Sequence, residues 1–282
     1  MSTLPQRAPL APIGLQNWAV VDLTLPIAED LPCHWATHQP FQVKTWNWFT
    51  DHRHPAATAL SRNGPYATRW MAIDEHTGTH LDAPCHFIPP EGSGLPDAGP
   101  AGSISVEQVA LRQLMGGCAV IEAGVTASET DGTRAGTSPL IMPEVIEEWE
   151  GRHGRLRPGE IVLLHTGWDR HYVRGEEGKR YVHDVVVTGR QPGWPAPSVA
   201  AIELLLERGI RCVGTDAPSM GPAHDGRPTH VAALRTGAVF VECLTGLSKL
   251  PARGAWFCFL PLNIEGGTGA PGRAVGFLPP AN

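Results

Sequence analysis

Short runs of apolar residues, each bounded by glycine, proline or a polar residue, recur along the chain. Such runs are typical of strands buried on both faces, because these strands need no polar alternation. We therefore expect strands at Val20–Leu23, Cys118–Glu122, Ile161–His165, Cys212–Thr215, Val239–Glu242, Trp256–Leu260 and Arg273–Leu278.

Three stretches have the spacing and the ends of helices. Met142–Trp149 follows a Ser-Pro pair, Ser198–Arg208 begins with a serine that can cap it, and Thr229–Thr236 is followed by Gly237. Capping serines and terminal glycines are typical of helix ends. Together with the strands, these helices predict an α/β protein, and we expect residues 1–282 to form a single domain.

Residues 30–68 show weak periodicity, and we expect a long irregular arm or a pocket-lining segment there. The segment contains the aromatic residues Trp35, Phe41, Trp46, Trp48 and Phe49. So many aromatic side chains indicate an interface, or a pocket for a flat, aromatic or cyclic molecule. Trp35 and Trp48 are the candidate substrate contacts.

Charge and hydropathy exclude several classes of partner. The formal net charge of the 282 residues is −6, and no long cluster of lysine and arginine occurs, so nucleic acid is not an expected partner. No apolar run reaches the length of a membrane-spanning helix, and no signal-peptide pattern precedes the first strand. We expect a cytoplasmic protein that does not bind membranes.

The densest chemistry lies in the sequence HTGTHLDAPCHF, which contains His76, His80 and Asp82. Its Thr-Gly-Thr spacer disfavours a helix, and an extended backbone points His80 and Asp82 to the same side. Gly78 allows the bend that brings His76 to them. Two imidazoles and one carboxylate leave positions open for water, which is typical of a catalytic rather than a structural metal site. Zn²⁺, Mn²⁺ and Fe²⁺ all suit these ligands.

His86 follows the cluster closely and is the candidate proton carrier. A divalent ion lowers the pKa of the water it binds, and an unligated imidazole can accept a proton or protonate a leaving group. This combination favours hydrolysis of an amide, imide, formamide or lactone. Gly-x-Ser-x-Gly is absent from the chain, so a serine triad is not favoured. A dinucleotide is not favoured as a cofactor either.

HTGTHLDAPCHF resembles the HxGTHxDxPxHF signature of the cyclase family of metal-dependent hydrolases, which includes kynurenine formamidase, isatin hydrolase and dienelactone hydrolase-like proteins. Further segments are similar to other family motifs in the same order: Val21-Asp-Leu-Thr-Leu, His165-Thr-Gly-Trp168, Val213-Gly-Thr-Asp-Ala-Pro-Ser219 and Leu262-Asn-Ile-Glu-Gly-Gly-Thr-Gly-Ala-Pro-Gly-Arg-Ala274. The resemblance implies a mixed sheet partly closed into a barrel, with flanking helices.

The resemblance also implies a set of ligands. His76, His80 and Asp82 are expected to bind the first ion, and Asp82 is expected to bridge to a second ion held by His230 and Glu242. Some relatives use one ion, but the presence of Glu242 favours two, as Zn²⁺ or Mn²⁺. The resemblance assigns proton transfer to His86, and it implies that residues 30–68 reach a neighbouring subunit in a homodimer or homotetramer.

Two further polar residues remain candidates. Asp216 follows a predicted strand and is expected either to support a metal-binding histidine or to cap a turn. Ser219 is a candidate donor to substrate or water. The main hypothesis is a hydrolase for an aryl formamide or a cyclic amide. The alternatives are a lactone hydrolase, a cyclase or dehydratase that does not hydrolyse its substrate, and a protein that binds metal and a small molecule without turnover.

Overall fold

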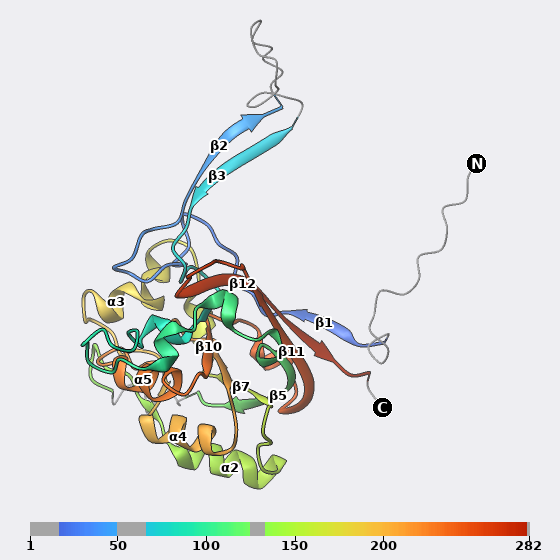
Figure 1. Ribbon diagram of the computed structural model, residues 1–282. Coiled ribbons are helices and arrows are strands. Elements are labelled where there is room, and N and C mark those ends of the chain that lie inside the picture. The colour runs from blue at the N-terminus through green and yellow to red at the C-terminus, as the bar shows by residue number, and fades with distance from the viewer. Residues whose placement is uncertain (1–16, 50–65, 125–132, 281–282) are drawn as a thin grey trace, which may run out of the picture.

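The computed structural model describes residues 17–49, 66–124 and 133–280. Its main sheet consists of β1 (Ala19–Asp22), β4 (His80–Asp82), β5 (Met115–Glu122), β7 (Ile161–His165), β9 (Cys212–Thr215), β10 (Val239–Glu242), β11 (Arg253–Pro261) and β12 (Gly269–Leu278). The strand order is β1-β12-β11-β5-β7-β9-β10-β4. Because β4 pairs with β12 as well as with β10, the strands from β12 to β4 close into a barrel (Figure 1).

The barrel is mixed. β5, β7, β9 and β10 are parallel neighbours, whereas β4, β11, β12 and β1 pair antiparallel. The predicted class, a mixed sheet closing into a barrel with flanking helices, is confirmed. Every strand that we expected from an apolar run is present, although several are longer or shifted by a residue.

Helices cover the outer face of the parallel strands, and α2 and α4 lie together at the base of Figure 1. They are α2 (Pro143–His153), α4 (Val199–Glu207) and α5 (Arg227–Leu234), whereas the short α3 (His183–Val186) packs in a separate apolar cluster with Trp168 and Trp194. The three predicted helices are confirmed as α2, α4 and α5. Ser198 caps α4 as expected, because its Oγ accepts a hydrogen bond of 3.1 Å from the amide of Ala201. None of the helices in the described ranges is long and apolar enough to cross a bilayer.

Short 3₁₀ turns connect these elements. They are η1 (Pro84–His86), η2 (Pro100–Ser103), η3 (Val106–Gln108), η4 (Leu111–Gln113), η5 (Trp168–His171), η6 (Glu176–Tyr181) and η7 (Leu247–Lys249). β6 (Leu140–Ile141) and β8 (Ala196–Pro197) form a small separate pair.

Alternation along the strands divides the core into two layers. On β7, Leu163 packs with the apolar cluster inside the barrel, whereas Val162 and Leu164 pack with residues of α2, α4 and α5 outside it. The same alternation operates on β4. Leu81 belongs to the inner cluster, so its neighbours His80 and Asp82 point to the outer face.

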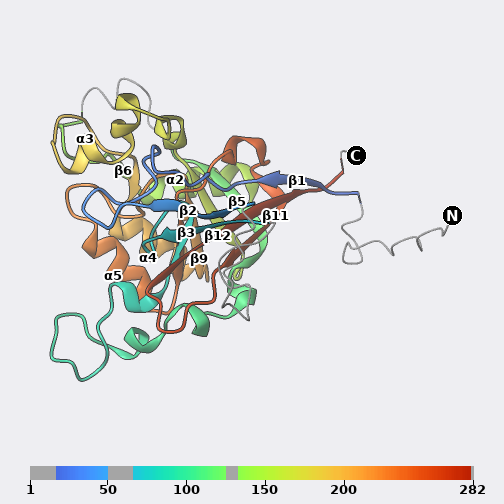
Figure 2. The ribbon, with the colours of Figure 1, turned by 90° about the horizontal axis from the view of Figure 1, so that it is seen from above.

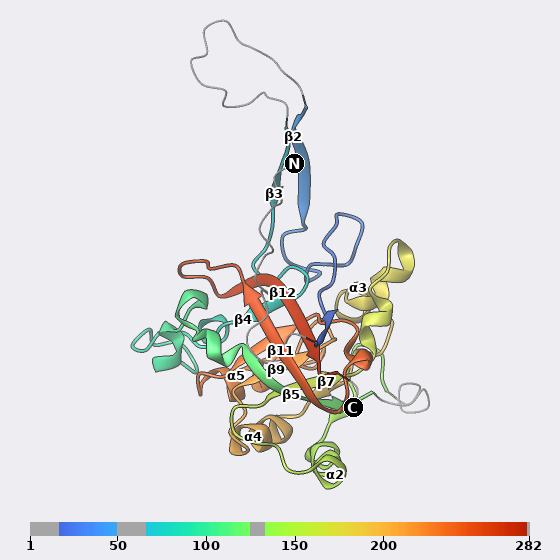
Figure 3. The ribbon, with the colours of Figure 1, turned by 90° about the vertical axis from the view of Figure 1, so that its right-hand side faces the viewer.

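A two-stranded ribbon stands out from the body in Figures 1 and 3, made of β2 (Gln42–Trp48) and β3 (Ala67–Ala72) in antiparallel pairing. Within residues 30–68, where we expected an irregular arm or a pocket-lining segment, β2 is a regular strand. Most side chains of both strands are exposed. The ribbon therefore lacks the alternation of apolar and polar residues by which a half-buried strand is recognised in a sequence. Residues 50–65 lie outside the described residues.

Candidate metal centre

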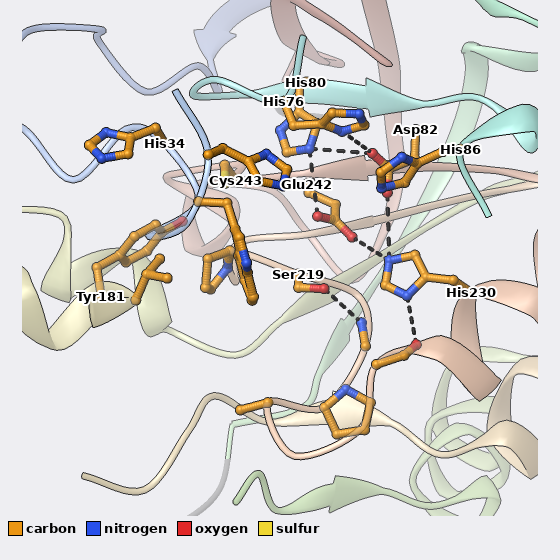
Figure 4. A pocket seen from close by; sticks show the side chains of 18 of the residues that line it. His34, His76, His80, Asp82, His86, Tyr181, Ser219, His230, Glu242 and Cys243 are labelled. Carbon is orange, nitrogen blue, oxygen red and sulfur yellow. Dashed lines mark hydrogen bonds and ion pairs between the residues drawn. The ribbon is translucent and has the colours of Figure 1, made fainter. Parts of the chain in front are cut away.

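The predicted ligands meet on the outer face of the barrel, where β4 and β10 run side by side beneath α5. In this antiparallel pair Glu242 lies opposite His80, and Phe240 lies opposite Asp82. Residues 240 and 242 are two apart, so Glu242 points to the same face as His80 and Asp82. His230 approaches from α5, and Figure 4 shows these side chains converging.

Asp82 lies at the middle of the cluster, and its side chain is 1% exposed. Its Oδ1 is 2.9 Å from Nδ1 of His76 and 3.4 Å from Nε2 of His80, and its Oδ2 is 3.6 Å from Nε2 of His230. Burial raises the pKa of Asp82, but the surrounding imidazoles, His86 first, outweigh it and hold the pKa well below the usual value. Oδ2 is buried without a hydrogen-bond partner among the described residues, as expected of a metal ligand.

Two of the histidines have one ring nitrogen already engaged. Nδ1 of His80 lies 2.8 Å from the carbonyl of Gly78, and Nδ1 of His230 lies 2.8 Å from the carbonyl of Gly226. A carbonyl only accepts, so each Nδ1–H donates and each Nε2 points at the carboxylates. The Nε2 atoms of His80 and His230 are 3.6 and 3.3 Å from the carboxylate oxygens of Glu242.

A cation would stabilise this arrangement, because imidazole lone pairs and carboxylate oxygens face each other. Without a metal ion, protons on the imidazoles of His80 and His230 supply the positive charge. Burial lowers the pKa of His230, but the neighbouring carboxylates of Asp82 and Glu242 outweigh burial and raise the pKa to about 10. Burial also lowers the pKa of His80, but Asp82 raises it by more, so that this pKa too lies well above the usual value. The donor set therefore fits divalent metal.

His76 is held differently. Its Nε2 lies 3.1 Å from Oγ1 of Thr268, and that hydroxyl donates its proton to Glu75 over 2.8 Å. The hydroxyl therefore accepts from Nε2–H of His76, which leaves Nδ1 directed at Asp82. Glu75 and Thr268 were not predicted as site residues from the sequence, because Thr268 is distant from His76 in the chain. The one sequence feature that could have indicated this contact is the position of the acidic Glu75 directly before His76.

The ligand atoms form two groups that share one residue. His76, His80 and Asp82 make the first group, and Asp82, His230 and Glu242 make the second, with the ligand atoms of each group within 4.8 Å of one another. A carboxylate has two oxygens, so Asp82 can serve both groups. The structure thus brings together all five residues that were predicted as metal ligands.

His86 lies beside both groups and belongs to neither. It ends η1, directly after β4, and its ring centroid is 4.0 Å from that of His76 and 6.4 Å from that of His230. Burial, supported by the neighbouring imidazoles and opposed by Asp82, lowers the pKa of His86 to about 3. Its imidazole is therefore neutral near pH 7.

A cavity of about 280 Å³ opens over the centre. Its lining includes the candidate residues Trp35 and Ser219 together with Phe87 and Tyr181. Trp35 packs edge-on against Trp194 at a centroid distance of 5.9 Å, which fixes its ring in the wall. Ser219 Oγ accepts a hydrogen bond of 3.1 Å from the amide of Gly221, and its proton remains available for a ligand.

The structure does not bring Trp48 or Asp216 to the centre. Trp48 is 63% exposed on the ribbon, outside the cavity lining. The carboxylate of Asp216 accepts hydrogen bonds from the amides of Thr166 and Gly167 and from the Thr166 hydroxyl, so it holds that turn instead of a metal-binding histidine. Burial raises the pKa of Asp216 to about 6.

Comparison with known proteins places this centre in a family. The model of the family described as putative cyclase matches residues 21–222. The chain belongs to the cyclase family. All of the predicted ligands of the first group, together with His86 and Ser219, fall within the matched part, whereas His230 and Glu242 lie beyond it.

Two relatives of this cyclase-family chain carry the names of enzymes. It is 34% identical over 225 residues to isatin hydrolase of Roseibium aggregatum, covering 78% of each chain. It is 29% identical over 212 residues to kynurenine formamidase of Salinibacter ruber, covering 73% of this chain and 77% of that one. A solved structure of isatin hydrolase A from Labrenzia aggregata, bound to benzyl benzoate, matches with a TM-score of 0.70 and 29% identity over 93% of this chain and 94% of that chain. The prediction of a hydrolase is confirmed.

Proposed function

We propose that this cyclase-family hydrolase uses divalent metal to cleave a small amide-type acyl bond, in an aryl formamide or a cyclic amide. The relatives named isatin hydrolase and kynurenine formamidase support this substrate class. The observation that carries the proposal is the position of Asp82, which belongs to both ligand groups while the cavity opens beside it.

The ligand groups set the metal content that we propose. His76, His80 and Asp82 hold one ion, and Asp82, His230 and Glu242 hold a second, with Zn²⁺ or Mn²⁺ as the metal. Such ions polarise a carbonyl group and lower the pKa of water. The nitrogen and oxygen donors here suit either metal.

His86 is the proposed general acid and base. Its imidazole lines the cavity, lies outside both ligand groups and is neutral near pH 7. In the first half of the reaction it accepts a proton from the attacking water. In the second half it returns that proton to the leaving nitrogen, so His86 ends each turnover in its starting state.

The walls of the cavity favour a flat substrate. Trp35 and Phe87 supply aromatic surface, and a cavity of about 280 Å³ admits one or two rings. Ser219 is placed to donate to an oxygen of the bound molecule. Trp48 and Asp216 have no place in this proposal, for the reasons given above.

The test begins with metal-free protein, reloaded with Zn²⁺ or Mn²⁺ and assayed on N-formylkynurenine, isatin and dienelactone. We expect metal-dependent hydrolysis of at least one amide, and a loss of about 10²–10⁴-fold in kcat for His86→Ala with metal still bound. His153→Gln is the matched control, since His153 is exposed at the end of α2, and it should leave kcat unchanged. Equal rates with and without metal would refute the mechanism.

The mass of the product separates the remaining functions. Hydrolysis adds one water to the substrate, a cyclisation or dehydration does not, and a binding protein leaves the substrate unchanged. Turnover of dienelactone without turnover of either amide would assign the enzyme to lactones. The homodimer or homotetramer and the cytoplasmic location stay predictions; light scattering of the purified protein tests the first.

A further inference from the structure

Arg227 is the single lysine or arginine among the cavity-lining residues, within the part of the chain that the structure describes. Its side chain is 52% exposed, whereas that of His230, three residues further along α5, is 4% exposed. Residues three apart on a helix share a face, with Cβ atoms about 5–6 Å apart. Helix α5 therefore carries a metal ligand at the buried end of the cavity and a permanent positive charge at its open end.

The guanidinium of Arg227 is only partly engaged. Its Nη2 lies 2.6 Å from Oδ2 of Asp97 and 3.4 Å from the carbonyl of Pro96. No other hydrogen bond of this guanidinium occurs among the described residues, so donors on Nε and Nη1 remain for a ligand. Figures 2 and 3 show the loop that contains Asp97, in teal, beside α5.

A ligand can replace Asp97 as the ion-pair partner of Arg227. Both side chains contact solvent, with exposures of 52% and 29%, and ion pairs at such positions contribute little to stability. A carboxylate on a bound molecule can make a two-pronged contact with the guanidinium, which is stronger than a contact through one nitrogen. Asp97 thus acts as a competitor that such a ligand displaces or joins.

We propose that Arg227 recognises a carboxylate on the substrate, at the end remote from the scissile amide, and that Asp97 tunes this recognition by competing for the guanidinium. The proposal rests on the amide hydrolysis proposed above and narrows its substrate class to aryl amides that carry an anionic group. An acyl group beside His230 places the far side of an attached ring towards Arg227, because both side chains leave the same face of α5.

The test compares substrates that share one scissile bond and differ in charge: formanilide, 3-formamidobenzoate and 4-formamidobenzoate, with the metal-loaded enzyme. We expect a higher kcat/KM for at least one of the two anionic substrates than for formanilide. In Arg227→Met the ratio of anionic to neutral kcat/KM should fall about 10- to 100-fold, mainly through KM, as expected for a lost charge-assisted contact.

Two further variants separate recognition from a structural role. Asp97 has a φ of 63°, a conformation that asparagine adopts readily, so Asp97→Asn keeps the loop and removes the competing charge. It should lower KM for the anionic substrate. Arg235→Met, at the exposed end of α5, removes the same charge away from the cavity and should leave the ratio unchanged.

The outcomes are distinct. An equal loss for anionic and neutral substrates in Arg227→Met, or a higher KM for the anionic substrate in Asp97→Asn, overturns the proposal. If the wild type hydrolyses none of the three formamides, the proposed function fails for this class, and calorimetric titration with 3- and 4-formamidobenzoate still decides the anion site. Binding of either compound that weakens in Arg227→Met but not in Arg235→Met supports it, and equal affinities, or no binding at all, reject it.

Discussion

Gly269 lies directly against the imidazole of His76. A Cβ atom on Gly269 would be 2.5 Å from Cε1 of His76 and 2.8 Å from both ring nitrogens. Gly269→Ala must therefore displace His76 from Asp82. We expect the affinity of the first metal site to fall about 10- to 100-fold, as when the support of a ligand is lost. Titration against a chelator of known affinity measures it.

Gly117→Ala on β5 is the control for this substitution. A Cβ on Gly117 would meet no atom within 4 Å, so metal affinity should equal that of the wild type. The interpretation fails if Gly269→Ala and Gly117→Ala bind metal alike.

Thr268 should matter through its hydroxyl alone. Thr268→Val keeps the shape of the side chain and removes the acceptor for Nε2–H of His76, so the ring is free to take the other tautomer. We expect weaker metal binding by about 10-fold or more. Thr268→Ser, which keeps the hydroxyl, should restore the affinity; no recovery would mean that packing, not the hydrogen bond, is responsible.

The sharing of Asp82 predicts unequal effects on metal content. Glu242→Gln keeps an oxygen for the amide of Met220, which donates to Glu242 over 2.6 Å, but removes a charge from the second group only. We expect one ion per chain in Glu242→Gln and almost none in Asp82→Asn, by elemental analysis after dialysis. Equal metal contents in the two variants would contradict the shared carboxylate.

Metal-free protein should lose stability at alkaline pH because of His230. The pKa of His230 is about 10 in the folded chain, against an ordinary value of 6.5 for a histidine, so the folded state binds the proton more tightly. This contribution is complete below pH 6.5 and is lost as the pH rises through about 10. Urea unfolding with chelator present should show a falling free energy of unfolding over that range.

His230→Gln separates this effect from other groups that titrate at alkaline pH. The variant should show a smaller decline between pH 6.5 and 10 than the wild type. An identical decline in both proteins would exclude His230 as the source.

The predicted parts of the fold are those whose buried positions require apolar residues. β7 and β10 are continuous apolar runs because both of their faces are covered, and such runs can be recognised in the sequence alone. The β2–β3 ribbon has exposed faces, so its sequence lacks that signal, and Trp48 was assigned to a pocket although it lies on the ribbon.

The candidate site also has a part that could be predicted from local sequence and a part that could not. His76, His80 and Asp82 are close in sequence, so a shared metal site was predicted from their spacing and the backbone geometry. His230 and Glu242 came only from the resemblance to the cyclase family, since α5 and β10 meet β4 through tertiary packing. The contacts of Thr268 with Glu75 and His76 depend on the register of β12 against β4, which no local pattern encodes.

The closure of the barrel at β4 has a consequence for how the protein opens. β4 is hydrogen-bonded along both edges, to β10 and to β12, and its middle residue, Leu81, is fully buried. A strand held on both sides cannot fray by itself, so the amide hydrogen of Leu81 should exchange with solvent only through global unfolding. Metal on the proposed ligands His80 and Asp82 would then leave through the cavity or on global unfolding of the barrel, and not by local unfolding of β4.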